Sequence, residues 1–200
     1  MSNSESNETL TRMGPGAAMG RVFRQFWQPA LLSEELPVAD CPPVRVRLMG
    51  EDFVAFRDSS GKVGLLDAHC PHRLADLFFG RNEEGGLRCV YHGWKFSVAG
   101  EILDMPSEPQ GSPMRCNPNL RAKAYPVREA GGIIWAYLGP QESMPALPDM
   151  EFMSLPPQNV HVSKCLMKCN YLQALEGSID TAHLTFLHHS MAPMEKDVFA

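Results

Sequence analysis

The chain has 200 residues, of which 44% are hydrophobic and 20% charged, as in an ordinary globular protein with enough apolar material for a core. Its formal net charge of −5 argues against a general nucleic-acid-binding role. The N-terminus is polar and acidic, and no run approaches the roughly 18 apolar residues of a membrane span. We therefore expect no secretory signal, no transmembrane segment and a cytoplasmic location.

The chain order predicts a mainly β protein with the α/β start of a second domain. Residues 1–24 are expected to be a polar lead-in, disordered or loosely held over residues 1–16. Residues 25–140 alternate short apolar–polar stretches with turns, which predicts an antiparallel β domain. Within it, a short helix and a docking segment precede strands expected at 44–48, 52–57, 63–66, 87–91, 95–97, 123–129 and 133–138.

Residues 141–160 are rich in proline, which favours an ordered crossing between two domains over regular structure. Residues 161–200 would then begin the second domain, with a strand over 161–170 and a helix over 171–189.

Two short motifs carry cysteine and histidine together. Cys70 and His72 are two positions apart, and Cys89 and His92 are three apart. Two thiolates on one iron and two imidazoles on the other is the ligand set of a Rieske [2Fe–2S] cluster, which transfers single electrons. A zinc site is an alternative, although structural zinc sites usually pair cysteine with cysteine. A Cys70–Cys89 disulfide would need an oxidising compartment.

Residues beside these motifs suggest how a cluster would be surrounded. Trp94, Leu74 and Phe78 are candidates for an apolar cover, or else ordinary core residues. Four cations form either a basic rim that steers an acidic electron donor or a solvated surface: Arg73, Arg81, Arg88 and Lys95. The remaining cysteines are interpreted as packing residues: Cys41, Cys116, Cys165 and Cys169.

A second constellation, Asp180, His183 and His188, lies in the predicted C-terminal helix. Asp180 and His183 would share a helical face, whereas His188 can join His183 on one metal only if the helix widens, bends or ends between them. Two imidazoles and a carboxylate with open positions suit non-haem Fe(II) that binds O₂. Taken alone, this spacing is a weak signal.

Together the two constellations resemble one family, the large (alpha) subunits of Rieske non-haem iron oxygenases, which hydroxylate aromatic rings. The strings CPHR, FFGRNEEGGLRCVYHGWKF, IIWAYLGP and NYLQALEGSIDTAHLTFLHH resemble its phthalate-dioxygenase branch over residues 20–200. One departure is Leu74-Ala75 after CPHR, where Gly-Ala is commoner; we expect it to change packing rather than chemistry.

The resemblance implies roles for particular residues. Cys70, His72, Cys89 and His92 match the cluster ligands, and His183 and His188 match two ligands of a mononuclear Fe(II). His189 falls just outside the motif. Asp180 matches an aspartate that links the cluster histidine of one subunit to an iron-ligand histidine of its neighbour.

The family's third iron ligand is a carboxylate far beyond the second histidine, and Glu195 and Asp197 are too near to supply it. We therefore interpret the chain as the N-terminal part of a protein about twice as long, whose helix-grip catalytic domain is only begun. The family implies a homotrimer or a multiple of it, an NAD(P)H-dependent flavin and iron–sulfur reductase as electron donor, and O₂ with a small aromatic substrate. The alternatives are an O- or N-demethylating monooxygenase of the same family, or a Rieske electron carrier without catalysis.

Overall fold

The computed structural model describes residues 3–188. These fall into two compact units. Residues 12–164 form the first, called here the β unit, and residues 3–11 with 165–188 belong to the second, called here the helical unit. None of the helices within residues 3–188 is both long and apolar enough to cross a membrane.

The β unit begins with helix α2 (Ala18–Phe23) and continues mainly as short strands. The strands are β1 (Gln28–Leu32), β2 (Val44–Leu48), β3 (Glu51–Arg57), β4 (Val63–Asp67), β5 (Arg81–Glu83), β6 (Gly86–Arg88), β7 (Lys95–Phe96), β8 (Ile102–Asp104), β9 (Ala124–Tyr125), β10 (Val127–Ala130) and β11 (Ile133–Ala136). Single turns of 3₁₀ helix lie at Ser33–Glu35, Leu77–Phe79, Pro113–Cys116, Gln141–Ser143, Glu151–Ser154 and Pro157–Asn159.

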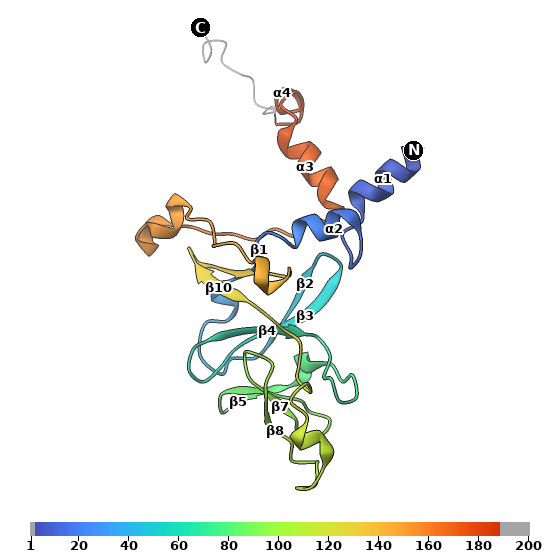
Figure 1. The fold of residues 1–200 in the computed structure, drawn as a ribbon. Coiled ribbons are helices and arrows are strands. Elements are labelled where there is room, and N and C mark those ends of the chain that lie inside the picture. Colours follow the sequence, from blue (N-terminus) through green and yellow to red (C-terminus); the bar gives the residue numbers. More distant parts are fainter. Residues whose placement is uncertain (1–2, 189–200) are drawn as a thin grey trace. The chain divides into compact units, whose positions relative to one another are not determined.

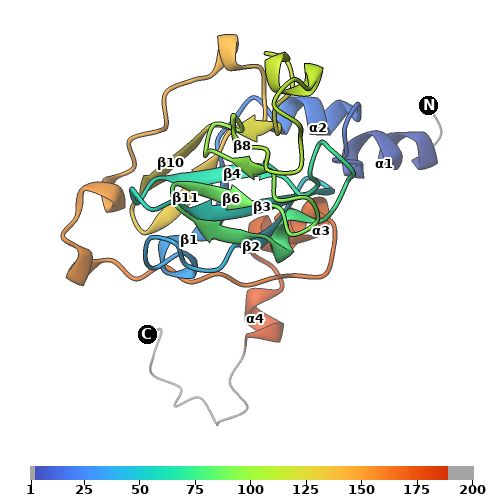
Figure 2. The same cartoon turned by 90° about the horizontal axis from the view of Figure 1, so that it is seen from below.

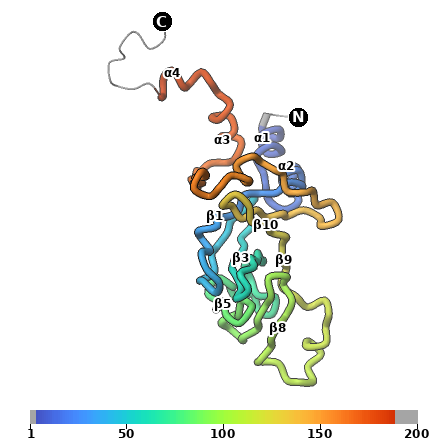
Figure 3. Tube along the Cα trace, turned by 90° about the vertical axis from the view of Figure 1, so that its left-hand side faces the viewer, coloured from blue at the N-terminus to red at the C-terminus, as the bar shows by residue number. Residues whose placement is uncertain are grey.

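The strands make three small antiparallel sheets, ordered β1-β11-β10, β2-β3-β4-β9 and β5-β6-β7-β8. The sheets follow one another through the unit in Figures 1 and 3, and their strands overlap when viewed from below in Figure 2. This arrangement confirms the predicted antiparallel β domain.

Strand β3 shows why the second sheet lies between the other two. Its residues 53–56 are all buried. Because side chains alternate along a strand, a continuous buried run means that both faces are covered. Val54 and Phe56 pack in the core shared with the third sheet, and Phe53 and Ala55 pack in the core shared with the first.

The strand expected over 123–129 is two strands in different sheets. Pro126, which has no N–H to donate to a ladder, lies between them. β9 pairs with β4, whereas β10 pairs with β11. The expected docking segment near residue 30 is strand β1, which pairs with β11.

The proline-rich segment packs on the first sheet through a small aromatic core. Trp27, Trp135 and Tyr137 are buried against apolar side chains from residues 144–153. The indole N–H of Trp27 donates to the carbonyl of Pro145 (2.9 Å). This hydrogen bond and apolar packing order a segment that has no regular ladder.

The helical unit contains α1 (Asn3–Thr11), α3 (Tyr171–Ile179) and α4 (Leu184–Leu187). Helix α1 corrects the expectation that residues 1–16 are disordered or loosely held. It contacts α3, and the Tyr171 hydroxyl donates to the carbonyl of Leu10. The polar composition concealed this helix because its stabilising contact comes from a segment 161 residues away.

Two C-terminal expectations are also wrong. Residues 161–167 form no strand, because no strand of the described chain pairs with them. The helix predicted over 171–189 ends at Ile179, and a separate turn of helix follows at Leu184–Leu187. His189 lies outside the described residues.

The cysteine expectation holds only for Cys41, which is buried in the core. Cys116, Cys165 and Cys169 are exposed.

Candidate metal centres

The loops at residues 70–75 and 89–94 have the same pattern of backbone hydrogen bonds. In the first, the N–H of Cys70 donates to the carbonyl of Ala75 (2.8 Å), and the N–H of Leu74 donates to the carbonyl of Cys70 (2.9 Å). In the second loop, the N–H of Cys89 donates to the carbonyl of Trp94 (2.8 Å), and the N–H of Gly93 donates to the carbonyl of Cys89 (3.1 Å). Each cysteine is therefore fixed at the start of a tight turn that carries its histidine.

Both turns need a left-handed residue at the fifth position. Gly93 supplies it in the second loop (φ 74°), and a Cβ there would lie 2.7 Å from Cγ of Pro106. In the first loop the position is Leu74, at φ 56°. A leucine in this region is strained. Leu74 is also 72% exposed, so it is neither an apolar cover nor a core residue, the two roles that the sequence left open.

The cysteine thiols are inaccessible to solvent. Cys70 and Cys89 are each 2% exposed. Burial, together with the neighbouring Cys89, raises the pKa of Cys70 to about 11. A thiol in this setting stays protonated at neutral pH unless a cation replaces the proton, which is what a bound metal does.

The two imidazoles lie together above the loops. The ring centroids of His72 and His92 are 4.6 Å apart, at 60°. Nδ1 of His72 is buried and has no hydrogen-bond partner among the described residues. Burial, followed by the charges of His92 and Arg73, lowers the pKa of His72, and Glu108 opposes this shift. A neutral imidazole with an orphaned, enclosed nitrogen is suited to bind a metal.

The donor set therefore fits two irons, with a pair of soft sulfur donors for one and a pair of imidazoles for the other. Within residues 3–188, no group of three or more histidine, cysteine, aspartate or glutamate side chains is placed to hold a single metal ion.

Trp94 combines the two roles that the sequence left open, because it is a core residue and also covers His72. It is fully buried and stacks on His72, with ring centroids 4.4 Å apart and planes at 3°. Phe78 is half-buried instead beneath the Arg45 guanidinium, which lies 4.1 Å from its ring centroid.

The basic rim is largely a set of internal ion pairs. Arg88, with 12% of its side chain exposed, donates to Glu83 (2.7 Å), to Asp104 (2.8 Å) and to the carbonyl of Gly93 (2.7 Å). Arg88 therefore supports the second loop, and its hydrogen bonds lower the pKa of Asp104. Lys95 is buried and pairs with Glu84 (3.1 Å). The sequence did not reveal these roles because the carboxylate partners come from other strands and turns.

The second constellation lies in the helical unit. Asn170 caps α3 by accepting from the backbone N–H groups of Leu172 (3.0 Å) and Gln173 (3.2 Å). The helix ends at Ile179, and the extended backbone of the next residue, Asp180 (ψ 110°), turns the chain. The sequence suggested that Asp180 and His183 share a helical face. They do not, because the helix ends before Asp180.

The turn nevertheless brings these side chains together. Oδ2 of Asp180 lies 3.2 Å from Nδ1 of His183, and Oδ1 accepts from the N–H of Ala182 (2.8 Å). The Ala182 N–H and then His183 lower the pKa of Asp180. His183 directly precedes α4 and His188 directly follows it, with ring centroids 5.4 Å apart. Helix α3 ends just before Asp180, and the single helical turn of α4 separates the two histidines.

The fold and the paired loops define the class as a protein with a Rieske [2Fe–2S] domain. A family model of that description matches residues 26–126, and one described as LigXa C-terminal domain like matches residues 136–198. The chain belongs to the Rieske non-haem iron oxygenases. A [2Fe–2S] cluster and a mononuclear non-haem iron are the cofactors of this family, as predicted.

Curated relatives of the chain are oxygenase subunits. The chain is 49% identical to the 3-chlorobenzoate-3,4-dioxygenase oxygenase subunit of Comamonas testosteroni, over 94% of this chain and 43% of that protein. It is 45% identical to the phthalate 4,5-dioxygenase oxygenase subunit of Pseudomonas putida, over 95% and 43%. It is 43% identical to the 5,5'-dehydrodivanillate O-demethylase oxygenase subunit of a Sphingobium strain, over 94% and 44%. The chain thus spans less than half the length of these relatives.

Solved structures show the same fold. Dicamba monooxygenase bound to 3,6-dichlorosalicylic acid superposes with a TM-score of 0.68 at 26% identity, covering 82% of this chain and 47% of that one. Dicamba monooxygenase with non-heme iron and dicamba gives 0.56 at 30% identity, covering 64% and 38%.

Proposed function

We propose that this chain is part of the oxygenase subunit of an enzyme system that hydroxylates a small aromatic substrate with O₂. One observation carries the proposal: a chain with the paired Cys–His loops also brings Asp180 against His183, with His188 nearby. A Rieske electron carrier needs only the paired loops.

In the proposed site, Cys70 and Cys89 hold one iron of the cluster, and His72 and His92 hold the other. His183 and His188 hold the mononuclear iron, and a carboxylate completes its ligand set. When bound, the cluster supplies single electrons and the mononuclear iron activates O₂.

Asp180 has a positioning role in this proposal. Its carboxylate accepts from Nδ1–H of His183, which fixes the tautomer that leaves Nε2 for the metal. A carboxylate can accept a further hydrogen bond from an imidazole N–H. We propose that this donor is a cluster histidine of a neighbouring subunit, in a homotrimer or a multiple of it.

The electron donor is proposed to be an NAD(P)H-dependent reductase with flavin and iron–sulfur centres. The name "oxygenase subunit" in three relatives implies a separate component of this kind.

An aromatic carboxylate is the proposed substrate class, because the names of three relatives at 43–49% identity refer to such compounds. One of those relatives is an O-demethylase, and a relative at 40% identity is named as a tert-butanol monooxygenase. Product analysis with benzoate, phthalate and a methoxybenzoate separates ring dihydroxylation from monooxygenation and demethylation.

The decisive variant is His183→Ala in the whole protein. Because the loops lie in a different unit, we expect turnover to be abolished while the visible and EPR spectra of the cluster persist. Iron content should fall from about three to about two per chain, since only the mononuclear site is lost.

His161→Ala is the matched control, because His161 is exposed and lies outside both constellations. It should retain turnover and all iron. Retained turnover in His183→Ala would refute the proposed iron ligand. A wild-type protein with about two irons and no O₂ consumption would instead establish the electron carrier.

A further inference from the structure

Ser107 lies in a turn just after β8 and contacts the fully buried Trp94. The Trp94 indole N–H donates to Oγ of Ser107 (3.2 Å). On its face, the same indole stacks on His72 at 4.4 Å and 3°. Ser107 is therefore one side chain removed from a histidine that faces the cluster site.

The turn that presents Ser107 is firmly held. The N–H of Glu108 donates to the carbonyl of Met105 (3.1 Å), which makes Pro106 and Ser107 the corner residues. Met105 is buried in the same core as Trp94. Pro106 lies so close to Gly93 that a Cβ added at residue 93 would lie 2.7 Å from Cγ of the proline ring. The turn thus packs directly against the second loop.

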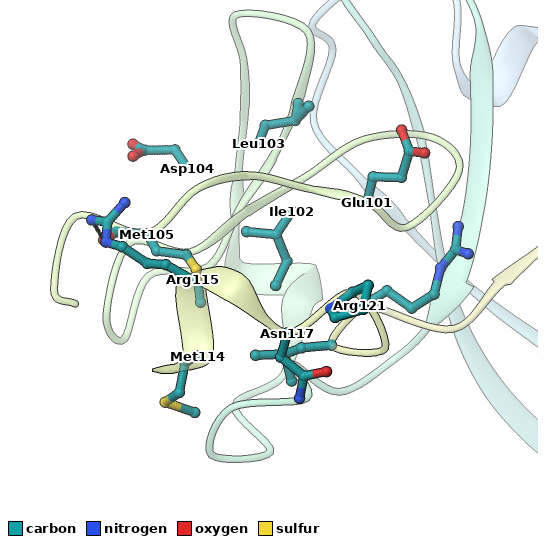
Figure 4. A pocket seen from close by; sticks show the side chains of 11 residues that line it. Glu101, Ile102, Leu103, Asp104, Met105, Met114, Arg115, Asn117 and Arg121 are labelled. Carbon is teal, nitrogen blue, oxygen red and sulfur yellow. Dashed lines mark hydrogen bonds between the residues drawn. The ribbon is translucent and has the colours of Figure 1, made fainter. Parts of the chain in front are cut away.

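Arg115 holds both ends of this turn. Its guanidinium donates to the carbonyl of Met105 and to the carbonyl of Glu108 (2.8 Å). Figure 4 shows Arg115 beside Met105 at one end of a pocket of about 330 Å³ between β8 and the following segment. An arginine bound to the carbonyls on both sides of Ser107 limits how far its hydroxyl can move.

We propose that Ser107 is a positioning residue for the cluster, which keeps Trp94 stacked on His72 and so sets the reduction potential. An indole N–H in a core needs a partner, so loss of the Ser107 hydroxyl frees the ring to tilt toward another acceptor or water. A tilted ring admits water beside His72. The proposal depends on the cluster alone and not on the oxygenation reaction.

The direction of the effect follows from charge. A cluster with two thiolate and two neutral imidazole ligands is formally neutral when oxidised and carries one negative charge when reduced. Water stabilises the charged form, so the reduction potential should rise when His72 is better solvated.

The test is a redox titration of the purified whole protein with its cluster, followed by visible absorption and EPR of the reduced state. In Ser107→Ala we expect the ratio of reduced to oxidised cluster at a fixed potential to rise about threefold, together with altered EPR g values. Ser107→Thr keeps the hydroxyl and should restore both properties.

Ser112→Ala is the matched control, because this serine of the same segment donates to Glu108 (3.0 Å) instead of contacting Trp94. It should titrate like the wild type. The proposal is overturned if Ser107→Ala leaves the ratio unchanged, lowers it or loses the cluster, or if Ser112→Ala shifts it equally. These readouts need neither substrate nor reductase, so they stand apart from any failure of the proposed oxygenation.

Discussion

At the residue scale, the left-handed Leu74 is strained in a way that its counterpart Gly93 is not. We predict that Leu74→Gly stabilises the protein by about 0.5–1 kcal/mol. Relief of a left-handed β-carbon is worth roughly 1–2 kcal/mol, and the greater freedom of glycine in the unfolded chain takes back about 0.4–1 kcal/mol. Little packing is lost, because Leu74 is 72% exposed. Denaturant unfolding of the cluster-bound protein measures the difference.

Gly93→Ala is the reciprocal variant, with the opposite expected sign. Its Cβ would lie 2.7 Å from Pro106 at φ 74°, so both packing and backbone oppose it. A destabilised Leu74→Gly protein would mean that the leucine makes a stabilising contact in the assembled molecule.

At the scale of elements, Arg57 and Glu129 join the second sheet to the first. Arg57 of β3 donates to both carboxylate oxygens of Glu129 on β10 (2.9 and 3.0 Å). Arg57, followed by Ser33, lowers the pKa of Glu129 below its usual range against the effect of burial. A lowered folded-state pKa contributes stability above the unfolded value, and this contribution disappears as pH falls through the folded value.

We therefore predict that Glu129→Gln lowers the free energy of unfolding at pH 7 by on the order of 1 kcal/mol, since the Glu129 side chain is 38% exposed and partly screened. The difference from the wild type should shrink as pH falls below about 4.5. Urea unfolding across that range measures it. Asp52→Asn removes the more exposed Arg47–Asp52 pair and should cost almost nothing. A Glu129→Gln effect that stays constant with pH would contradict the ionic origin.

Local signals explain which elements the sequence could predict. The alternation of apolar and polar side chains in β2 and the turn before β4 depend only on neighbouring residues. The cluster motifs are equally local, because the ligands within each motif lie two or three positions apart. The split of β9 from β10 at Pro126 depends on which strands are available as partners. Helix α1 and the support of Ser107 by Arg115 likewise depend on contacts with other segments. Spacing suggested the Asp180–His183 contact, but a helix end creates it.

At the scale of the whole molecule, the division into two units predicts that the cluster half is self-sufficient. All three buried cores draw their residues from the β unit, as do the four proposed cluster ligands. The two proposed iron-ligand histidines lie in the helical unit, where many apolar side chains are exposed: Leu166, Met167, Ile179, Phe186 and Leu187. Exposed apolar surface of this kind is typical of a region that packs against more protein.

We predict that a protein of residues 12–164 folds alone and binds about two irons and two acid-labile sulfides, with a Rieske EPR signal and no third iron. The physical reason is that its burial and its donor set are internal, because all residues of the three cores lie within 12–164. The whole protein should bind about three irons per chain. Iron and sulfide analysis with circular dichroism measures both. A 12–164 protein that aggregates or cannot retain the cluster would show that the second unit supports the first.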